Sequence, residues 1–361
     1  MEIGRTIRVG MPAGEVDLSA VWLRSQCGCV MCAHPSGQRL LDPACISPDV
    51  SPIRIEQGDG LLRVWWTPDD HVSSYDVNGL SAATAADAGS AVQTWDRSSL
   101  SALPTAHHDD VCSNDSALAD WLQQVERKGV GMLHGVPIAD GEVVRVAELF
   151  GFVRETNYGR FFDVRSVVDP TNLANTSLGL AAHTDNPYRD PVPSLQLLHC
   201  LSSSASGGEN IVVDGFRVAE QVQREQPDGF MLLASRSVSF SYQDDSTSLS
   251  AVSPLIELDT FGAVRAVRFN ARSMQPPQLA LDEMVRWYDA YLHFARLLAD
   301  PAFQVQFKLE PGDLFIVHNR RVLHGRTAYE ATSGERHLQG CYADIDGLRS
   351  TISVLSRSLS S

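Results

Sequence analysis

The sequence is poor in lysine and has no long apolar run. Only two lysines, Lys128 and Lys308, occur among its 361 residues, and arginine supplies the rest of the positive charge. This scarcity excludes a polybasic membrane tether and leaves little scope for Schiff-base chemistry. No apolar run approaches the 18 residues of a membrane-spanning helix, and Met1–Gly10 hold polar and charged side chains where a signal peptide needs an apolar stretch. We therefore expect a cytoplasmic protein without a membrane segment.

Positively charged residues are also fewer than negatively charged ones. The chain has 29 Lys and Arg against 44 Asp and Glu, which gives a formal net charge of −15. Such a surface repels phosphate backbones, so we expect no nucleic-acid partner. Hydrophobic residues make up 43% and charged residues 20%, a composition typical of globular proteins. The length predicts two domains.

Composition divides the chain into three regions. Residues 1–80 hold short strand-like runs around a cluster of cysteines. Residues 81–115 are rich in Ala, Ser, Thr and Asp with little periodicity, which is typical of a linker. Residues 116–361 show regular hydrophobic patterns. We expect an N-terminal domain in 1–80, a linker in 81–115 and a larger domain in 116–361.

The larger region combines a few helices with many short strands. Asp115 or Ser116 can cap a helix that ends at Gly129, and a longer helix is predicted over 281–299. Nearly everything else after Ser194 predicts strands of five to seven residues separated by turns. This pattern favours a β-barrel or sandwich buttressed by helices.

The sequence His183-Thr184-Asp185 is a candidate metal site. Residues at i and i+2 of an extended segment point to the same side, so the imidazole and the carboxylate can share one ion. His324 follows a predicted strand at 314–317 and would complete a triad of two histidines and one carboxylate, which leaves open positions on Fe(II).

Two other histidines compete with His324. His318 directly continues the apolar strand and His199 lies in an apolar run, so both are better explained as wall or core residues. Arg336 lies twelve residues after His324, and its guanidinium could bind a carboxylate in a bidentate manner.

Three of the seven cysteines form a C-x-C-x-x-C motif at Cys27, Cys29 and Cys32. Three thiolates at this spacing can bind Zn²⁺, and a fourth ligand would close a structural site. The candidates for the fourth ligand are His34, Cys45 and His71. We favour His71, because His34 lies so close that the loop would have to turn back sharply.

Taken together, these motifs carry a family resemblance that extends over nearly the whole chain. The sequence resembles the γ-butyrobetaine and trimethyllysine hydroxylases, a family of Fe(II)- and 2-oxoglutarate-dependent dioxygenases that includes related trimethylaminoethylphosphonate hydroxylases. The matching segments are 22–32, the region around His71, 158–159, 183–187, 195–200, 207–209, 213–216, 324–326 and 342–344.

The resemblance implies the fold and the cofactors. The fold would be α+β and mainly β, with a double-stranded β-helix (jelly-roll) catalytic domain buttressed by helices and preceded by a small zinc-binding, β-rich domain. The chain would use Fe(II), 2-oxoglutarate, O₂ and a structural zinc, and would form a homodimer. The resemblance assigns iron to His183, Asp185 and His324, the distal carboxylate of 2-oxoglutarate to Arg336 and Asn210, and zinc to Cys27, Cys29, Cys32 and His71.

The resemblance also implies a substrate site. Tyr158, Phe162 and Tyr342 fall at three positions of an aromatic cage for a trimethylammonium group, and Asn175 stands where a fourth aromatic residue would be expected. The positions expected to contact the substrate's anionic end, or to lie beside that contact, are Asn172, Asn186, Asn270 and Arg272. Each of these side chains also has an ordinary explanation, as a core aromatic or a turn former.

We expect an enzyme that hydroxylates an unactivated C–H bond in a small trimethylammonium zwitterion of the γ-butyrobetaine type and releases succinate and CO₂. The alternatives are a quaternary ammonium phosphonate such as 2-trimethylaminoethylphosphonate, a taurine-like sulfonate or an amino acid. A third reading, a non-catalytic adaptor with a decayed barrel, has nothing in its favour because the triad and Arg336 are all present.

Overall fold

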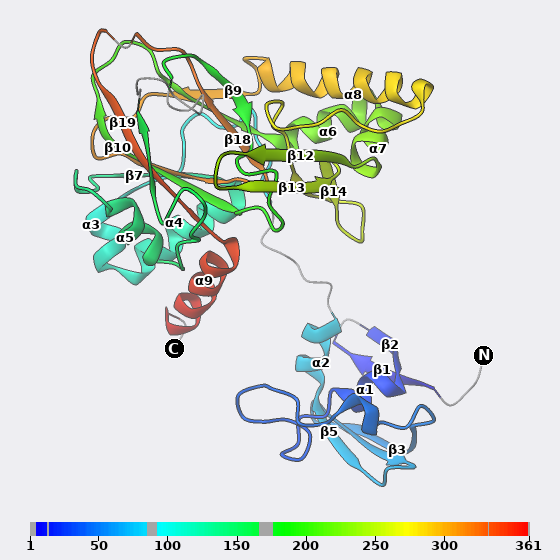
Figure 1. Cartoon of the computed structure of the whole chain (residues 1–361). Helices are drawn as coiled ribbons and strands as arrows, with labels where there is room; N and C mark the ends of the chain where they lie inside the picture. Colours follow the sequence, from blue (N-terminus) through cyan, green and yellow to red (C-terminus); the bar gives the residue numbers. More distant parts are fainter. Residues whose placement is uncertain (1–4, 13, 85–91, 166–175, 331, 360–361) are drawn as a thin grey trace. The chain divides into compact units, whose positions relative to one another are not determined.

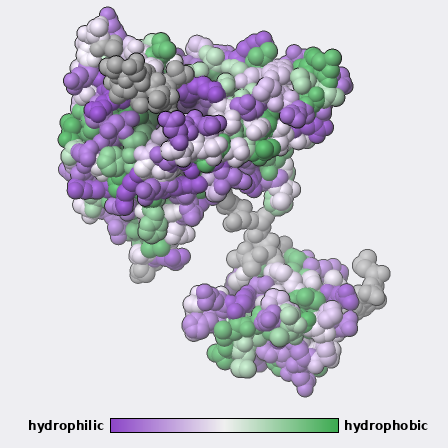
Figure 2. Space-filling view, in the orientation of Figure 1, coloured by the Kyte–Doolittle hydropathy of each residue, from purple (hydrophilic) through white to green (hydrophobic). Residues whose placement is uncertain are grey.

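The computed structural model describes residues 5–12, 14–84, 92–165, 176–330 and 332–359. The chain divides into two compact units, Met1–Gly89 and Ser90–Ser361, which are described separately (Figure 1). Within the described ranges, no helix is both long and apolar enough to cross a membrane. The visible face of each unit mixes hydrophilic and hydrophobic residues (Figure 2).

In its described residues, the smaller unit consists of a β-hairpin, a three-stranded antiparallel sheet, two short α-helices and one 3₁₀ helix. In β1, Ile7 and Val9 are buried while Arg8 between them is exposed, which is the alternation of a strand with one buried face. Ser19 begins α1 by accepting a hydrogen bond from the backbone N–H of Trp22. The elements are β1 (Thr6–Met11), β2 (Gly14–Ser19), α1 (Ala20–Ser25), η1 (Pro43–Cys45), β3 (Ser51–Gly58), β4 (Leu61–Thr67), β5 (Val72–Asp76) and α2 (Val77–Thr84).

The larger unit is built on two sheets. All neighbouring strands in them pair in antiparallel fashion except β6 and β7. The first sheet has the order β6 (Thr105–His107), β7 (Val130–His134), β17 (Leu314–His318), β10 (Leu195–Ser203), β19 (Arg336–Ala343) and β8 (Phe162–Arg165). The second has the order β16 (Gln304–Phe307), β11 (Asn210–Asp214), β18 (Val322–Arg326) and β9 (Leu180–His183).

Helices and two further hairpins surround these sheets. Figure 1 shows α6, α7 and α8 grouped together, and α3, α4, α5 and α9 in a second group. The helices are α3 (His108–Ser113), α4 (Asp115–Lys128), α5 (Glu142–Glu148), α6 (Gly215–Glu225), α7 (Pro227–Ser235), α8 (Leu281–Ala299) and α9 (Ile345–Leu359). Two hairpins complete the unit, β12 (Val238–Gln243) with β13 (Ser248–Ser253) and β14 (Ile256–Leu258) with β15 (Val264–Val267).

The predicted helix over 281–299 is confirmed as α8, but the expectation of strands elsewhere after Ser194 is wrong for α6, α7 and α9. In α6 the side chain of Asp214 accepts a hydrogen bond from the N–H of Phe216 and starts the helix. Phe216, Ala219 and Val222 then recur at helical spacing on the buried face. This periodicity was present in the sequence and indicates a helix.

Helix α4 ends where expected but begins with a different cap. Gly129 follows the helix in the left-handed region at φ 74°, which favours glycine. At the other end, the cap is Asn114 and not Asp115 or Ser116. The side-chain oxygen of Asn114 accepts hydrogen bonds from the N–H groups of Ser116 and Ala117, so the helix starts one residue earlier.

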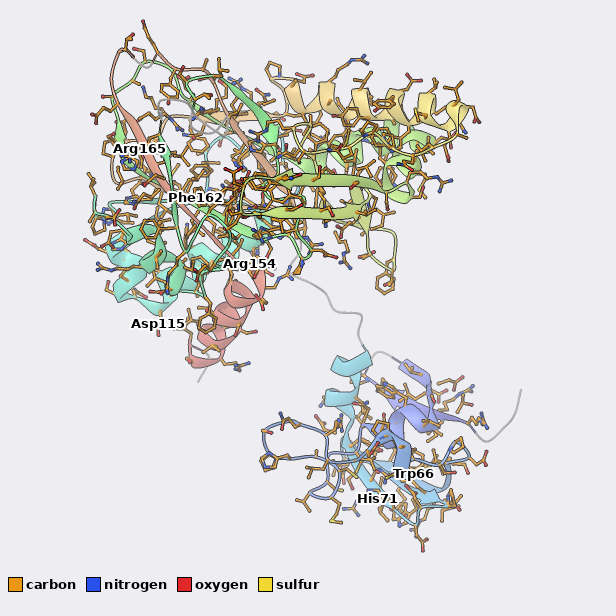
Figure 3. The ribbon with its side chains drawn as sticks, in the orientation of Figure 1. Trp66, His71, Asp115, Arg154, Phe162 and Arg165 are labelled. Carbon is orange, nitrogen blue, oxygen red and sulfur yellow. The ribbon has the colours of Figure 1, made fainter. Side chains whose placement is uncertain are left out.

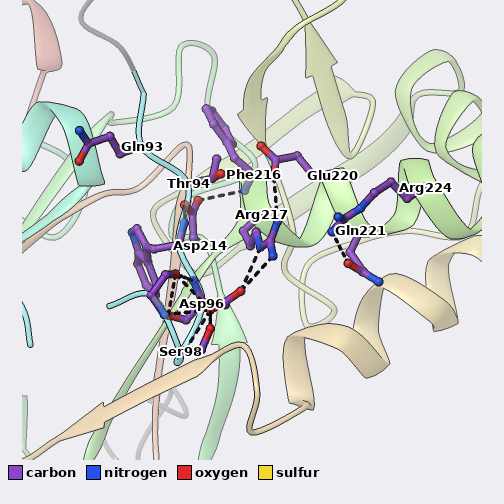
Figure 4. A network of polar contacts seen from close by, with 12 residues as sticks. Gln93, Thr94, Asp96, Ser98, Asp214, Phe216, Arg217, Glu220, Gln221 and Arg224 are labelled. Carbon is purple, nitrogen blue, oxygen red and sulfur yellow. Dashed lines mark hydrogen bonds and ion pairs between the residues drawn. The ribbon is translucent and has the colours of Figure 1, made fainter. Parts of the chain in front are cut away.

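The region 81–115, expected to be a linker, is regular or packed over much of its described length. It contains the end of α2, then β6 and α3. Trp95 is buried, and its backbone N–H donates to Asp214 Oδ2 at 3.0 Å. Arg321 forms a fully buried ion pair with Asp214 and donates to the carbonyl of Gln93 at 2.7 Å. Figure 4 shows Asp214 among the polar contacts that attach this segment to the larger unit.

Candidate active site

The pairing of β9 with β18 brings two histidines together. His183 and His324 lie directly opposite each other in the register, and their ring centroids are 4.7 Å apart. His183 Nε2 lies 3.2 Å from Asp185 Oδ1, and His324 Nε2 lies 3.8 Å from Asp185 Oδ2. One ligand atom from each of the three residues lies within 4.8 Å of the others. This donor set fits a divalent metal ion with open coordination positions.

Hydrogen bonds outside the triad orient its members. His183 Nδ1 donates to the carbonyl of Ala181 at 2.9 Å, which leaves Nε2 free to bind a metal. Asn319 is fully buried and holds the backbone of Asp185 from both sides. Its Oδ1 accepts from the Asp185 N–H at 2.7 Å, and its Nδ2 donates to the Asp185 carbonyl at 3.0 Å.

The carboxylate of Asp185 has two further donors that lie on neighbouring strands. Gln196 on β10 and Tyr342 on β19 are direct cross-strand partners. Gln196 Nε2 donates to Asp185 Oδ2 at 2.7 Å, and the Tyr342 hydroxyl donates to the same atom at 2.9 Å. The sequence analysis missed Gln196. The available signal was a polar residue inside the apolar run of 195–198.

The electrostatics of the triad favour metal binding. Burial disfavours the charged carboxylate, but hydrogen bonding to His183 and the charges of both histidines outweigh it, so the pKa of Asp185 lies well below its usual range. Burial above all, with a contribution from His183, lowers the pKa of His324 to about 3. A charged carboxylate and a neutral imidazole are the protonation states that a metal ion requires.

Arg336 and Asn210 meet in the same part of the fold. Arg336 on β19 is 8% exposed, and its Nη2 donates to Asn210 Oδ1 at 3.3 Å. Its buried Nη1 has no hydrogen-bond partner among the residues that the structure describes. Burial lowers the pKa of Arg336 from its ordinary value. A buried guanidinium with an unpaired N–H fits the carboxylate of a small organic acid.

One cavity of about 440 Å³ connects these groups. Its wall includes the three triad residues, Arg336 and Asn210, and it also includes most of the predicted substrate residues. Those on the wall are Tyr158, Phe162, Asn186, Asn270, Arg272 and Tyr342. Asn172 and Asn175 lie outside the described residues. Figure 3 labels Phe162 on β8.

The polar residues that line the cavity differ in their hydrogen bonding and exposure. Asn186 is 3% exposed at φ 52°, and in the described part of the chain neither of its side-chain polar atoms has a partner. Asn270 donates to the Thr184 carbonyl and accepts from the Arg272 N–H, so it also supports the loop. The Arg272 residue is exposed on the cavity wall.

The three predicted aromatic residues form a continuous group. The ring centroids of Tyr158 and Phe162 lie 6.1 Å apart, and those of Phe162 and Tyr342 lie 5.2 Å apart. Tyr188 and Tyr242 line the same cavity and were missed by the sequence analysis. Neither belongs to a recognisable motif, so only their position in the fold reveals them.

The smaller unit contains the second candidate metal site. His71 Nε2 lies 3.3 Å from Cys27 Sγ and 3.7 Å from both Cys29 Sγ and Cys32 Sγ. Figure 3 labels His71 in this unit. His34, the alternative ligand, instead contacts the Ser36 hydroxyl at 2.8 Å, and Cys45 is exposed. Three thiols and one imidazole fit a closed tetrahedral zinc site.

Comparison with known proteins identifies the family. Residues 99–342 match the sequence model of the taurine catabolism dioxygenase TauD, TfdA family, and residues 4–81 match that of the γ-butyrobetaine hydroxylase-like N-terminal family. The chain is 38% identical over 348 residues to a γ-butyrobetaine dioxygenase of Pseudomonas sp. (strain AK-1), covering 93% of this chain and 90% of the relative. The chain belongs to the γ-butyrobetaine and trimethyllysine dioxygenase family.

Further relatives agree with this assignment to the dioxygenase family. The human γ-butyrobetaine dioxygenase is 30% identical over 356 residues, and a trimethyllysine dioxygenase of Meyerozyma guilliermondii is 28% identical over 360 residues. Both alignments cover 93% of this chain and 90% of the relative.

Solved structures confirm the fold of the dioxygenase family in this chain. A taurine dioxygenase from Burkholderia xenovorans superimposes with a TM-score of 0.52 at 16% identity, covering 67% of this chain and 88% of that chain. An asparagine oxygenase in complex with Fe(II), 3-hydroxyasparagine and succinate superimposes with a TM-score of 0.51 at 19% identity, covering 63% and 78%. The expected mainly-β jelly-roll fold with helices is therefore confirmed.

This dioxygenase is a 2-oxoglutarate-dependent enzyme that uses Fe(II) and O₂. The His-Asp-His group fits the iron, the unpartnered Nη1 of Arg336 fits the cosubstrate, and the Cys₃His cluster is consistent with a structural zinc. Its substrate is a small molecule.

Proposed function

We propose that the enzyme hydroxylates an unactivated C–H bond in a small trimethylammonium zwitterion of the γ-butyrobetaine type and releases succinate and CO₂. The observation that carries this proposal is the placing of the Tyr158, Phe162 and Tyr342 rings on the wall of the cavity that also contains the His-Asp-His triad. Aromatic faces attract a quaternary ammonium group, which cannot form hydrogen bonds. The named activities of the relatives support the same substrate class.

In this proposal His183, Asp185 and His324 hold Fe(II), and Arg336 with Asn210 binds the distal carboxylate of 2-oxoglutarate. When bound, iron and 2-oxoglutarate together supply an oxidant strong enough for an unactivated C–H bond. The protein orients one substrate carbon toward the metal through the aromatic rings, and the burial of His183 and His324 keeps water away from the reacting atoms. Gln196 and Tyr342 hold the carboxylate of Asp185 in one orientation.

The anionic end of the substrate is assigned to Asn186, Asn270 and Arg272, with Asn172 and Asn175 as further candidates. The unpartnered, buried side chain of Asn186 supports this role. Arg272 favours a second candidate, a quaternary ammonium phosphonate, because an arginine on the cavity wall can neutralise a more highly charged tail. A taurine-like or amino-acid substrate would leave the aromatic group without a role.

The remaining proposals concern organisation. Cys27, Cys29, Cys32 and His71 would hold zinc in an N-terminal domain of residues 1–80, joined through 81–115 to a dioxygenase domain of residues 116–361. The second part of that connection packs on the larger unit. A cytoplasmic homodimer is the proposed state of the enzyme.

The test is reconstitution under anaerobic conditions with Fe(II) and 2-oxoglutarate, followed by admission of O₂. Succinate and hydroxylated product are measured with γ-butyrobetaine, trimethyllysine and 2-trimethylaminoethylphosphonate supplied separately. Stoichiometric coupling to one product identifies the substrate. Succinate formation that none of the three accelerates would contradict the trimethylammonium proposal, and a Phe162→Ala variant should lose affinity for a quaternary amine but not for a sulfonate.

A further inference from the structure

Two tyrosines extend the aromatic group beyond the three predicted residues. Tyr242 comes from β12, and Tyr188 comes from the loop after Asp185. Their rings stack with centroids 5.0 Å apart and an interplanar angle of 24°. The Tyr242 ring also meets Tyr158 edge to face at 6.1 Å, and the hydroxyls of Tyr158 and Tyr188 lie 3.0 Å apart. The five rings therefore form an unbroken arc in the order 342, 162, 158, 242, 188.

We infer that Tyr242 is a specificity-determining residue that supplies an aromatic wall for the quaternary ammonium group of the substrate. The inference rests on the proposed function and adds the hairpin of β12 and β13 to the substrate site. The sequence has Asn175 where a fourth aromatic residue was expected, and asparagine has no aromatic ring. Tyr242 lines the same cavity as Tyr158 and Phe162 and is in ring contact with Tyr158, so it can supply the missing face.

The turn of the hairpin holds the Tyr242 ring in place. The Tyr242 hydroxyl donates to Asp244 Oδ2 at 2.7 Å. Asp244 is itself fixed, because its Oδ1 accepts from the Ser246 N–H at 2.8 Å and its own N–H donates to the Thr247 carbonyl at 2.8 Å. A phenol that donates to a carboxylate has a more electron-rich ring, which strengthens its attraction for a cation.

The hairpin is structurally separate from the metal ligands. The β12–β13 pair forms its own two-stranded sheet, whereas the two histidines of the triad lie on the β16-β11-β18-β9 sheet. Phe240 bridges to Met274, and Gln275 Nε2 donates to the Ser241 hydroxyl at 2.9 Å, so the hairpin is anchored on the segment after β15. A substitution of Tyr242 therefore changes the substrate wall without touching an iron ligand.

The experiment compares a cationic ligand with its neutral isostere in three proteins: wild type, Tyr242→Leu and Tyr242→Phe. The enzyme is loaded with Fe(II) and 2-oxoglutarate without O₂, and calorimetry measures the affinity for γ-butyrobetaine and for 5,5-dimethylhexanoate, in which carbon replaces the charged nitrogen. In Tyr242→Leu we expect affinity for γ-butyrobetaine to fall by about 2- to 30-fold, the range of one cation–π contact, with little change for the isostere. Tyr242→Phe should retain most of the preference for the cation.

The matched control is Tyr288→Leu, which removes a half-buried tyrosine ring of α8 that does not line the cavity. This control should bind both ligands like the wild type. Equal weakening of both ligands in Tyr242→Leu, or no weakening of either, would overturn the inference while leaving the proposed function intact. A wild-type enzyme that shows no preference for the cation over the isostere would instead overturn the proposed function. Circular dichroism and thermal melting establish that each variant is folded.

Discussion

At the scale of single residues, the two oxygens of Asp185 have different surroundings. Oδ1 faces His183 at 3.2 Å, while Oδ2 accepts hydrogen bonds from Gln196 and Tyr342. The two donors occupy Oδ2 and leave Oδ1 as the more available ligand for a metal ion. Residues that hold a ligating carboxylate in this way contribute to metal affinity although they do not touch the metal.

Replacing Gln196 by leucine should weaken Fe(II) binding. The substitution removes one of the two donors to Asp185 Oδ2 and places an apolar side chain next to a buried carboxylate. We expect the affinity for Fe(II) to fall by roughly 10- to 100-fold, the usual effect of losing such a partner. Competition with a chromophoric chelator measures this affinity for Fe(II). Gln306→Leu on the exposed face of β16 is the control, and unchanged iron affinity in Gln196→Leu would contradict the role given to Gln196.

At the scale of the secondary-structure element, β19 carries much of the site on one face. Every second residue of the strand points to the same face. On this face, the cavity is lined by Arg336, Leu338 and Tyr342. Gly340 lies between the last two at the same spacing and pairs with Phe162 of β8. A Cβ atom at Gly340 would lie 2.6 Å from Phe162 Cζ, so the glycine makes room for the aromatic ring.

Replacing Gly340 by alanine should reshape the aromatic wall. The new methyl group would also lie 2.9 Å from Leu198 Cδ2, so the methyl group itself has no free space to move into. The Phe162 ring would therefore be displaced. We expect the KM for the trimethylammonium substrate to rise several-fold and the protein to lose about 1–3 kcal/mol of stability, as in other overpacked cores. The KM for 2-oxoglutarate should change less. Gly58→Ala, where a Cβ meets nothing within 4 Å, is the control.

Strand β10 also carries a buried histidine that should make the stability of the enzyme sensitive to acid. His199 is fully buried, and burial lowers its pKa to about 4, below the ordinary value of 6.5. At pH values between these two pKa values, His199 is protonated in the unfolded chain and neutral in the folded chain. The free energy of unfolding therefore falls as the pH falls from 6.5 toward 4, by up to about 1.4 kcal/mol per pH unit for this group.

Replacing His199 by leucine should flatten this dependence. Urea unfolding between pH 7 and pH 4.5 measures the free energy of unfolding, and the variant should lose less of it than the wild type over that range. His34→Leu removes an exposed histidine of the smaller unit and should leave the slope unchanged. Parallel slopes in wild type and His199→Leu would exclude His199 as a source of acid sensitivity.

At the scale of the whole molecule, the chain keeps its two candidate metal sites in separate units. The proposed zinc ligands lie between Cys27 and His71 in the first unit, and the proposed iron ligands lie between His183 and His324 in the second. The first unit has its own hydrophobic core, which includes Leu23 and Trp66. A small core of this kind gains much of its stability from a bound metal.

Loss of zinc should therefore destabilise the first unit and leave the second unit's iron site in place. We expect Cys29→Ser to contain little zinc by elemental analysis and to show an additional unfolding transition at lower temperature. Its affinity for Fe(II) should stay within about threefold of the wild type, because no iron ligand is changed. Cys45→Ser is the control for an exposed cysteine outside the cluster, and equal zinc loss in this variant would argue against the assigned ligand set.

The sequence by itself determined those features whose residues lie close together along the chain. The His183-Thr184-Asp185 motif, the three clustered cysteines and the periodic helix over 281–299 could all be read directly, because their parts lie within a few turns or one extended segment. His71 and Arg336 were also candidates from the residues alone, and the family resemblance assigned them to zinc and to 2-oxoglutarate. Helices α6, α7 and α9 were missed, although in α6 the residues Phe216, Ala219 and Val222 recur at helical spacing.

Only the tertiary structure decided which distant side chains meet. Gln196 reaches Asp185, Tyr242 joins the arc beside Tyr158, and Asn319 holds the backbone of Asp185 across 134 residues of sequence. None of these pairs has a fixed spacing that a motif could encode. The physical reason is that strand register and hairpin placement set such contacts, and both depend on packing over the whole core and not on the neighbouring residues.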